Sequence, residues 1–354
     1  MNQERDKYKS WCIITVLITA IFLVLIAAMT AVIDPYWHFH GPSAGVSYRL
    51  GNGRYMNDGI LRHADYEAVI IGTSMTENFK PSQWNQLTGE MTVKTPFFGA
   101  SFREIHDTLE RTFTRRDIQT VIWGMDYNQL TNVWDTYKYE SYPDYLSDDS
   151  IWNDGDYVWN KTVLFRGVLA DIVYTLSGKE SADYDAYASW ERPCGKNAVL
   201  EQYTPGTAMP GQKVVTQEAL QTVEENVAKN FEEIIKNHPE TRFYLFFTPY
   251  SIAYWDLVYH EGNINLQMEA TRIFAERLLS YENVRLYCFF DNTNLICNLD
   301  NYADAGHYTG EVNDDILQWM WSGAYRWTKD NFEEKLEEME TFYGSFDYES
   351  YWNE

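Results

Sequence analysis

A serine, a histidine and an aspartate are the residues of this chain whose types and spacing could do chemistry together. Ser74 follows Gly72-Thr73 at the end of an apolar run, and His307 stands three residues after Asp304, just before an apparent helix. A serine hydroxyl is a poor nucleophile until a base removes its proton. A carboxylate on the far ring nitrogen orients the imidazole and stabilises its protonated form. We therefore interpret the three residues as a candidate catalytic triad.

Each motif also has a simpler structural interpretation. A strand followed by Gly-Thr-Ser is often a turn with a helix N-cap, and an isolated Asp-x-x-His is usually a hydrogen-bonded structural pair. The turn is not a phosphate-binding P-loop, since no Gly-Lys-Ser/Thr follows. The other six histidines have no acid-containing loop as suggestive as that of His307; they are His38, His40, His63, His106, His238 and His260.

Short apolar runs alternate with helical patterns and would position these residues. This alternation predicts βαβ units, and hence an α/β fold with a three-layer architecture, a parallel sheet flanked by helices. A serine directly after a buried parallel strand would lie at the carboxyl edge of the sheet, where open α/β folds bind ligands. The expected strands are 66–72, 92–98, 120–123, 242–248 and 284–290, and the expected helices are 102–114, 216–237, 265–280 and 311–325.

The N-terminal part predicts a membrane anchor. Residues 11–33 carry no charge and, at about 1.5 Å per residue, match the roughly 30 Å hydrocarbon core of a bilayer. A cleaved signal peptide is the alternative, but the apolar stretch is longer than a typical signal core and no clear cleavage site closes it. Basic residues before the helix predict that residues 1–10 form a cytoplasmic tail and that the rest lies outside; these are Arg5, Lys7 and Lys9, with no further Lys or Arg until Arg49.

The remainder divides into three expected parts. Residues 34–63 are a linker and the start of the extracytoplasmic domain, and 64–330 are the α/β domain, interrupted by an insertion at about 129–211. In the insertion aromatic and acidic residues are interleaved, which suits sugar binding but equally an insertion that packs its rings and exposes its acids. Residues 331–354 are an acidic C-terminal segment, with 333–340 expected as a solvated helix end.

Charge and cysteine content exclude several classes of protein. The 354 residues include 28 Lys and Arg against 52 Asp and Glu, a formal charge of −24 that disfavours nucleic acid as a partner. Four cysteines are too few for a disulfide scaffold. Cys288 and Cys297 could pair in an oxidising compartment, or Cys288 could be a buried thiol of its strand. No Cys/His spacing resembles a zinc site, and we expect neither a metal nor a cofactor.

The two motifs together resemble the first and last blocks of the SGNH (GDSL-like) hydrolase superfamily. Gly72-Thr73-Ser74 is similar to the first block and Asp304-Ala305-Gly306-His307 to the last, so the resemblance covers roughly residues 64–128 and 215–325. It implies an SGNH/flavodoxin-like fold and gives the roles of nucleophile to Ser74, base to His307 and orienting acid to Asp304.

The resemblance also implies an oxyanion hole, and here the sequence departs from the family. The first two donors would be the N–H groups of Ser74 and Gly99, the latter within Phe98-Gly99-Ala100-Ser101. The family takes the third donor from an Asn in Gly-x-Asn-Asp, but this chain has Asp126 at that position, with Asn128 as a substitute two residues later. Losing one donor costs about 10² to 10³ in rate.

With this departure and a single anchor, the chain is similar to membrane-anchored members of the superfamily that act in acylation of cell-envelope polymers. These are the DltD-type proteins of teichoic acid D-alanylation and the alginate O-acetylation proteins. The resemblance implies a membrane-anchored, extracytoplasmic acyltransferase or esterase that acts on a cell-surface glycopolymer, takes an acyl donor and works beside a multi-span membrane acyltransferase. The alternative is an inactive protein of the same fold that binds polysaccharide or serves as a scaffold.

Overall fold

The computed structural model describes residues 2–51, 53–139, 143–206 and 211–353. They belong to two compact units. Unit 1 comprises Met1–Ala64 and Ser141–Asp183, and unit 2 comprises Asp65–Glu140 and Tyr184–Glu354. The predicted triad lies entirely within unit 2.

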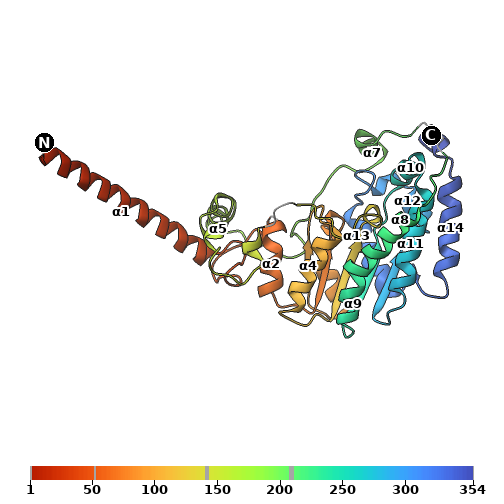
Figure 1. Ribbon diagram of the computed structural model, residues 1–354, viewed down its shortest axis with the longest axis horizontal. Coiled ribbons are helices and arrows are strands. Elements are labelled where there is room, and N and C mark those ends of the chain that lie inside the picture. Colours follow the sequence, from red (N-terminus) through yellow and green to blue (C-terminus); the bar gives the residue numbers. More distant parts are fainter. Residues whose placement is uncertain (1, 52, 140–142, 207–210, 354) are drawn as a thin grey trace. The chain divides into compact units, whose positions relative to one another are not determined.

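Unit 2 is built on a sheet of six strands in the order β2-β1-β3-β4-β5-β6 (Figure 1). The first five are parallel to their neighbours, and β6 is antiparallel to β5. The α/β class with a mostly parallel sheet is therefore confirmed. The strands are β1 (Ala68–Gly72), β2 (Thr92–Pro96), β3 (Thr120–Met125), β4 (Arg242–Phe247), β5 (Val284–Cys288) and β6 (Arg326–Trp327).

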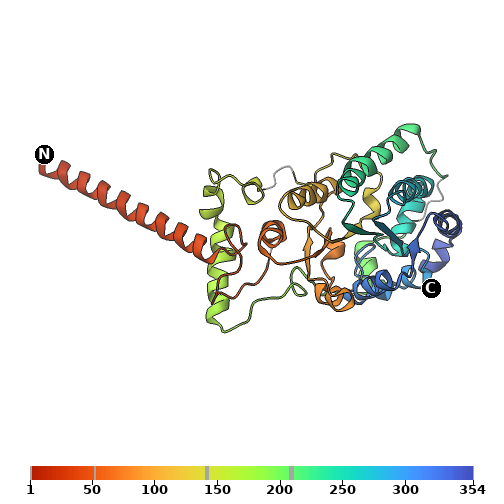
Figure 2. The ribbon, with the colours of Figure 1, turned by 90° about the horizontal axis from the view of Figure 1, so that it is seen from below.

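Helices cover both faces of this sheet, which is why its strands are nearly continuous apolar runs. Every residue of β1, β2 and β3 is buried. In Figure 2 the helices α4, α8 and α11 lie on one side of the strands, and α3 and α13 on the other. Their bounds are α3 (Pro81–Thr88), α4 (Phe102–Phe113), α8 (Gln217–Val227), α9 (Glu233–Asn237), α10 (Ile252–His260), α11 (Ile264–Leu278), α12 (Thr293–Ile296) and α13 (Gly310–Ser322).

The expected elements agree with the observed ones to within a few residues, with two differences. The helix expected over 216–237 contains a π-helical stretch, η5 (Ala228–Glu232), between α8 and α9. The segment expected as a solvated acidic end is helix α14 (Phe332–Ser345), which buries one face through Leu336, Met339 and Tyr343. Its many glutamates lie on the other face and hide this periodicity. A short helix, α15 (Tyr348–Asn353), ends the described chain.

Unit 1 begins with the long helix α1 (Asn2–Ile33), whose residues Arg5–Ile33 are long and apolar enough to cross a membrane. The carboxylate of Asp34 then accepts hydrogen bonds from the amides of His38, Phe39 and His40, so the chain turns sharply after the helix. Part of the expected linker forms α2, and part of the expected insertion packs in the same unit. The elements are α2 (Gly53–His63), α5 (Gly155–Val158), η4 (Val163–Val168, a π-helical stretch) and α6 (Leu169–Leu176).

Candidate active site

The turns that follow three neighbouring strands meet at the carboxyl edge of the sheet. Gly72 of β1 lies in register with Pro96 of β2, and Ile71 with Trp123 of β3. The chain therefore delivers Ser74, Gly99 and Asp126 from adjacent strand ends. This is the edge at which open parallel sheets bind ligands.

The serine turn is held by its neighbours in sequence. A Cβ on Gly72 would lie 2.6 Å from Thr76 Cγ2 and 3.3 Å from the Gly124 carbonyl oxygen, so a larger residue does not fit. The Thr73 hydroxyl accepts a hydrogen bond from the Met75 amide at 3.3 Å and caps the 3₁₀ turn Ser74–Thr76. Ser74 is buried, with 8% of its surface exposed.

The loop that carries the histidine is closed on itself. Tyr302 and Tyr308 form an antiparallel bridge, and the Ala303 amide donates to the His307 carbonyl at 2.8 Å. Inside the loop, Asp304 Oδ1 accepts from the amides of Gly306 at 2.9 Å and His307 at 2.8 Å. Backbone donors therefore fix the carboxylate before it meets the imidazole.

Hydrogen bonds to one carbonyl join this loop to the serine turn. The Tyr308 hydroxyl and the Asn313 side-chain amide both donate to the carbonyl oxygen of Met75, each at 3.2 Å. On the other side, the Ser251 amide and hydroxyl donate to the Ala305 carbonyl at 3.0 and 2.9 Å. The two halves of the candidate triad, 233 residues apart in sequence, are thus held by backbone contacts as well as by their side chains.

The three predicted residues lie in hydrogen-bond contact in the order that base catalysis needs. Ser74 Oγ lies 2.8 Å from His307 Nε2, and His307 Nδ1 lies 2.8 Å from Asp304 Oδ2. Burial would raise the pKa of Asp304, but hydrogen bonds from the His307 ring and from the His307 and Gly306 amides hold that pKa below its ordinary value. An ionised Asp304 keeps a proton on Nδ1, which leaves Nε2 free to accept the proton of Ser74.

Two of the expected oxyanion donors are available. Within the described chain, the amides of Ser74 and Gly99 donate to no other protein group. Gly99 has a φ of 64°, in the left-handed region that favours glycine. Asn128, expected as the third donor, is exposed and its side-chain oxygen accepts from the Tyr250 hydroxyl at 3.4 Å. Its part in the oxyanion hole stays a prediction.

Asp126 occupies the buried position after β3. It is 6% exposed, and its Oδ2 accepts hydrogen bonds from the Thr73 hydroxyl at 2.7 Å and from Gln129 Nε2 at 3.4 Å. No protein group of the described chain hydrogen-bonds to its Oδ1. Burial raises the pKa of Asp126 to about 6, against the hydrogen bond from Thr73, the nearby His307 and Gln129. This carboxyl group is therefore far easier to protonate than an ordinary aspartate.

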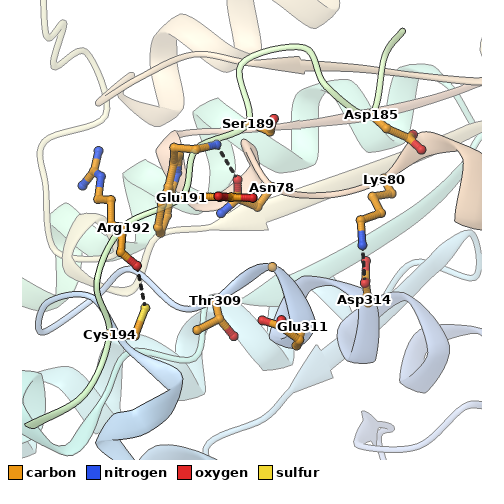
Figure 3. A pocket seen from close by; sticks show the side chains of 12 residues that line it. Asn78, Lys80, Asp185, Ser189, Glu191, Arg192, Cys194, Thr309, Glu311 and Asp314 are labelled. Carbon is orange, nitrogen blue, oxygen red and sulfur yellow. Dashed lines mark hydrogen bonds and ion pairs between the residues drawn. The ribbon is translucent and has the colours of Figure 1, made fainter.

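A cavity of about 410 Å³ lies next to Thr309 and Gly310, which follow the histidine loop, and it is lined by the side chains drawn in Figure 3. The ring of Trp190, one of its lining residues, meets the His307 ring edge-on with centroids 5.9 Å apart. The guanidinium of Arg192 lies over the Trp190 ring, 4.7 Å from its centroid. Charged residues of both signs line the cavity; they are Lys80, Asp185, Glu191, Arg192, Glu311 and Asp314.

The loop that carries Trp190 is fastened by residues that the sequence did not single out. The Trp190 amide donates to Asn78 Oδ1 at 2.9 Å, and Asp185 accepts from the Ser82 amide and hydroxyl. The ammonium of Lys94, buried in β2, donates to the carbonyls of Glu77, Phe79 and Asp185. In the sequence, the one signal for this role is a lysine within an expected strand.

Glu77 is a second carboxyl group close to the triad. Burial raises its pKa to about 7, against the opposing effects of the nearby His307, Arg192 and Lys94. No local sequence pattern distinguishes it from a surface glutamate. Within the described residues, no group of three or more His, Cys, Asp or Glu side chains is arranged to hold a metal ion.

Comparisons with known proteins add little to this picture. No family model and no curated protein matches the chain. A solved structure from Streptococcus pneumonia, described provisionally as a platelet activating factor, matches with a TM-score of 0.39 and 11% identity, over 77% of this chain and 91% of that one. A likeness this distant carries no argument about activity, so the function has to be inferred from contacts within this chain.

Proposed function

We propose that this chain is an SGNH-type serine enzyme that transfers or hydrolyses acyl groups, such as O-acetyl or D-alanyl, on a cell-surface glycopolymer. The observation that carries the proposal is the relay in which Ser74 Oγ and Asp304 Oδ2 each lie 2.8 Å from a nitrogen of the His307 ring. Hydrogen-bond contact from nucleophile to base to orienting acid is the arrangement that activates a serine.

In the proposed reaction Ser74 Oγ attacks the acyl carbonyl carbon while its proton passes to His307 Nε2. The oxygen that becomes negative is bound by the amides of Ser74 and Gly99. The bond to the leaving alcohol breaks, and that alcohol takes the proton from His307. An acceptor hydroxyl then attacks the acyl-enzyme ester and gives its proton to His307, which returns it to Ser74. Water as acceptor makes an esterase, and a polymer hydroxyl makes a transferase.

Asp126 serves this reaction only as a neutral acid. An ionised carboxylate beside the oxyanion would repel it, whereas a protonated one donates a hydrogen bond. The bond from Thr73 to Oδ2, the unpartnered Oδ1 and the pKa of about 6 support Asp126 as the third donor in its protonated form. The adjoining cavity beside Trp190 would receive the part of the substrate next to the acyl group.

The proposed location is the outer face of the cell membrane. Helix α1 would be the single anchor, with Arg5, Lys7 and Lys9 on the cytoplasmic side. A multi-span membrane acyltransferase would be the partner that supplies the acyl donor. The high negative charge of the chain disfavours nucleic acid as a partner.

Labelling with a fluorophosphonate probe tests the nucleophile. The wild-type protein should be labelled and Ser74→Ala should not. Ser189→Ala is the matched control, because Ser189 lines the neighbouring cavity but its hydroxyl donates to the Ala186 carbonyl. Equal labelling of wild type and Ser74→Ala would overturn the assignment.

The alternative, an inactive protein that binds polysaccharide or serves as a scaffold, predicts no labelling in either protein. Mass spectrometry of envelope polymers from cells that carry Ser74→Ala separates the two further. Loss of one acyl modification supports the enzyme, and an unchanged acylation profile with normal protein levels supports the scaffold.

A further inference from the structure

Unit 1 exposes a strip of large apolar side chains between residues 152 and 176. Trp152 is 91% exposed, Phe165 64%, Val173 63% and Leu176 83%, and Trp159 and Leu169 are also exposed. We call these six residues the apolar strip. Phe165, Leu169, Val173 and Leu176 are spaced by four, four and three residues, so they share one face of the helical segment formed by η4 and α6. Water is a poor solvent for a continuous apolar face of this kind.

The opposite face of the same segment is fixed to the chain that follows α1. A Cβ on Gly167 would lie 2.5 Å from Pro35 Cγ, so the Pro35 ring packs directly against the backbone of Gly167. Buried Asp171 accepts hydrogen bonds from the Arg49 amide at 3.4 Å and from Arg49 Nε at 3.3 Å. The apolar strip is therefore displayed by a firmly packed helix and not by a loose end. Figure 2 shows this yellow-green segment beside the end of α1.

Contacts with α1 fix the position of the apolar strip along that helix. The Trp159 indole N–H donates to the Leu23 carbonyl at 3.2 Å, and the Thr30 hydroxyl donates to the Val158 carbonyl at 3.2 Å. Leu23 lies ten residues, or about 15 Å, before the end of α1 at Ile33. The segment thus runs alongside the last turns of the apolar helix.

The length of α1 decides whether those turns lie in the membrane. From Trp11 to Leu23 the helix is only about 20 Å long, too short for a hydrocarbon core of roughly 30 Å. The part after Leu23 must therefore also lie within the bilayer if α1 spans it. Trp159, bonded to Leu23, then lies at or below the membrane surface.

The charges around the strip suit lipid headgroups. Although the whole chain carries a charge of −24, residues 158–179, which hold five of the six strip residues, contain the exposed bases Lys161, Arg166 and Lys179 and a single acid, the buried Asp171. The acids Asp154 and Asp156 lie between the sixth strip residue, Trp152, and Trp159. Basic side chains beside an apolar helix face extend their charged ends to the headgroups while their stems stay in the apolar layer.

We propose that the apolar strip lies in the interfacial layer of the lipid bilayer, so that unit 1 is seated by α1 across the membrane and by the 163–176 helix along its surface. This rests on the proposed anchoring by α1. On this proposal, part of the aromatic insertion binds lipid and not sugar.

Depth-dependent fluorescence quenching tests the proposal on the full chain. The protein, with Cys12 and Cys194 changed to Ser, is placed in nanodiscs of phosphatidylcholine and phosphatidylglycerol and labelled at one added cysteine. Val173→Cys and Phe165→Cys probe the strip, Val16→Cys probes the anchor, and Glu180→Cys probes an exposed polar position just beyond α6. The quenchers are nitroxides near the top of the lipid chain and iodide in water.

We expect the lipid nitroxide to quench Val173→Cys and Phe165→Cys at least about half as strongly as it quenches Val16→Cys, and iodide to quench only Glu180→Cys. Quenching at Val16→Cys with iodide access at both strip positions would overturn the interfacial helix while leaving the anchor intact. No lipid quenching at Val16→Cys would overturn the anchor and with it this inference. Iodide that quenches the strip positions in nanodiscs but not in native membranes would show that a membrane protein covers the strip there. This result would overturn the lipid assignment.

Discussion

The hydroxyl of Thr73 donates a hydrogen bond to Asp126 Oδ2 at 2.7 Å, which joins the residue before the candidate nucleophile to the residue after β3. This contact fixes one oxygen of a buried carboxyl group beside the serine turn and leaves the other without a protein partner within the described chain. The charge of this group affects three tyrosines, Tyr250, Tyr254 and Tyr308, whose pKa values it raises, and the nearby His307 lowers the pKa of Asp126 itself. Its protonation state should therefore govern the site.

The first prediction concerns the pH dependence of Ser74 labelling. With a pKa of about 6, Asp126 loses its proton as pH rises through that value, so the labelling rate of the wild type should fall. In Asp126→Asn the side-chain amide donates a hydrogen bond at every pH. At pH 8 this variant should therefore be labelled up to roughly 10² times faster than the wild type. Rates of fluorophosphonate labelling from pH 5 to 9 measure this; coincident profiles for the two proteins would rule out the role.

The same group predicts a pH dependence of folding. Its folded pKa of about 6 lies above the ordinary value near 3.9, so its stabilisation is fully present below about pH 4 and is lost as pH rises through 6. The free energy of unfolding should fall by up to about 3 kcal/mol over that range in the wild type and by less in Asp126→Asn. Urea unfolding at pH 4.5 and pH 7.5 provides the comparison, and an equal fall in both proteins would contradict it.

A further prediction concerns the orienting acid. In Asp304→Asn the neutral amide no longer stabilises a protonated His307, so the labelling rate should fall by about 10² to 10⁴. The exposed Asp300, four residues earlier, provides the control, and Asp300→Asn should label like the wild type. A loss of less than tenfold in Asp304→Asn would argue against the relay.

The hydrogen bonds that connect the serine turn to the histidine loop are also testable. Tyr308→Phe removes one of the two donors to the Met75 carbonyl and should cost about 1 kcal/mol of stability and slow labelling several-fold. Tyr343→Phe removes a similar buried bond, from the Tyr343 hydroxyl to the Phe290 carbonyl at 2.8 Å, far from the serine. It should lower the melting temperature comparably and leave labelling unchanged. Equal effects on labelling would mean that Tyr308 acts only through stability.

The buried ammonium of Lys94 should matter for both stability and access to the site. Lys94→Met leaves the carbonyls of Glu77, Phe79 and Asp185 without this donor, which should cost at least about 3 kcal/mol. Lys229→Met, which removes an exposed pair with Glu233, should cost less than about 1 kcal/mol. Denaturant unfolding compares them; similar losses would show that the bonds of Lys94 contribute little.

Sequence patterns predicted the sheet because its strands are buried on both faces and so are nearly continuous apolar runs. β6 escaped prediction because two residues are too few to show any periodicity. The contact of Ser74 with His307 could be anticipated because a serine directly after a buried strand and an Asp-x-x-His loop hold the residue types of a catalytic triad. The buried face of α14 could not be anticipated, since its buried residues stand among glutamates in the sequence.

The remaining site residues act through tertiary contacts that no local pattern records. Trp190 reaches His307 from a loop more than a hundred residues earlier, and its place depends on Asn78 and Asp185. Asp126 was recognised as a departure, but only its burial and its bond from Thr73 indicate that it titrates near pH 6.

The bonds from Tyr308 and Asn313 to Met75 also bear on when the nucleophile becomes reactive. During synthesis Ser74 leaves the ribosome more than two hundred residues before its base, and the turn around it lacks these donors until α13 has docked. In the nascent chain Ser74 therefore has no contact with His307, and its hydroxyl is an ordinary one. On the proposed function, Ser74 becomes reactive toward acyl esters only when the C-terminal part has folded.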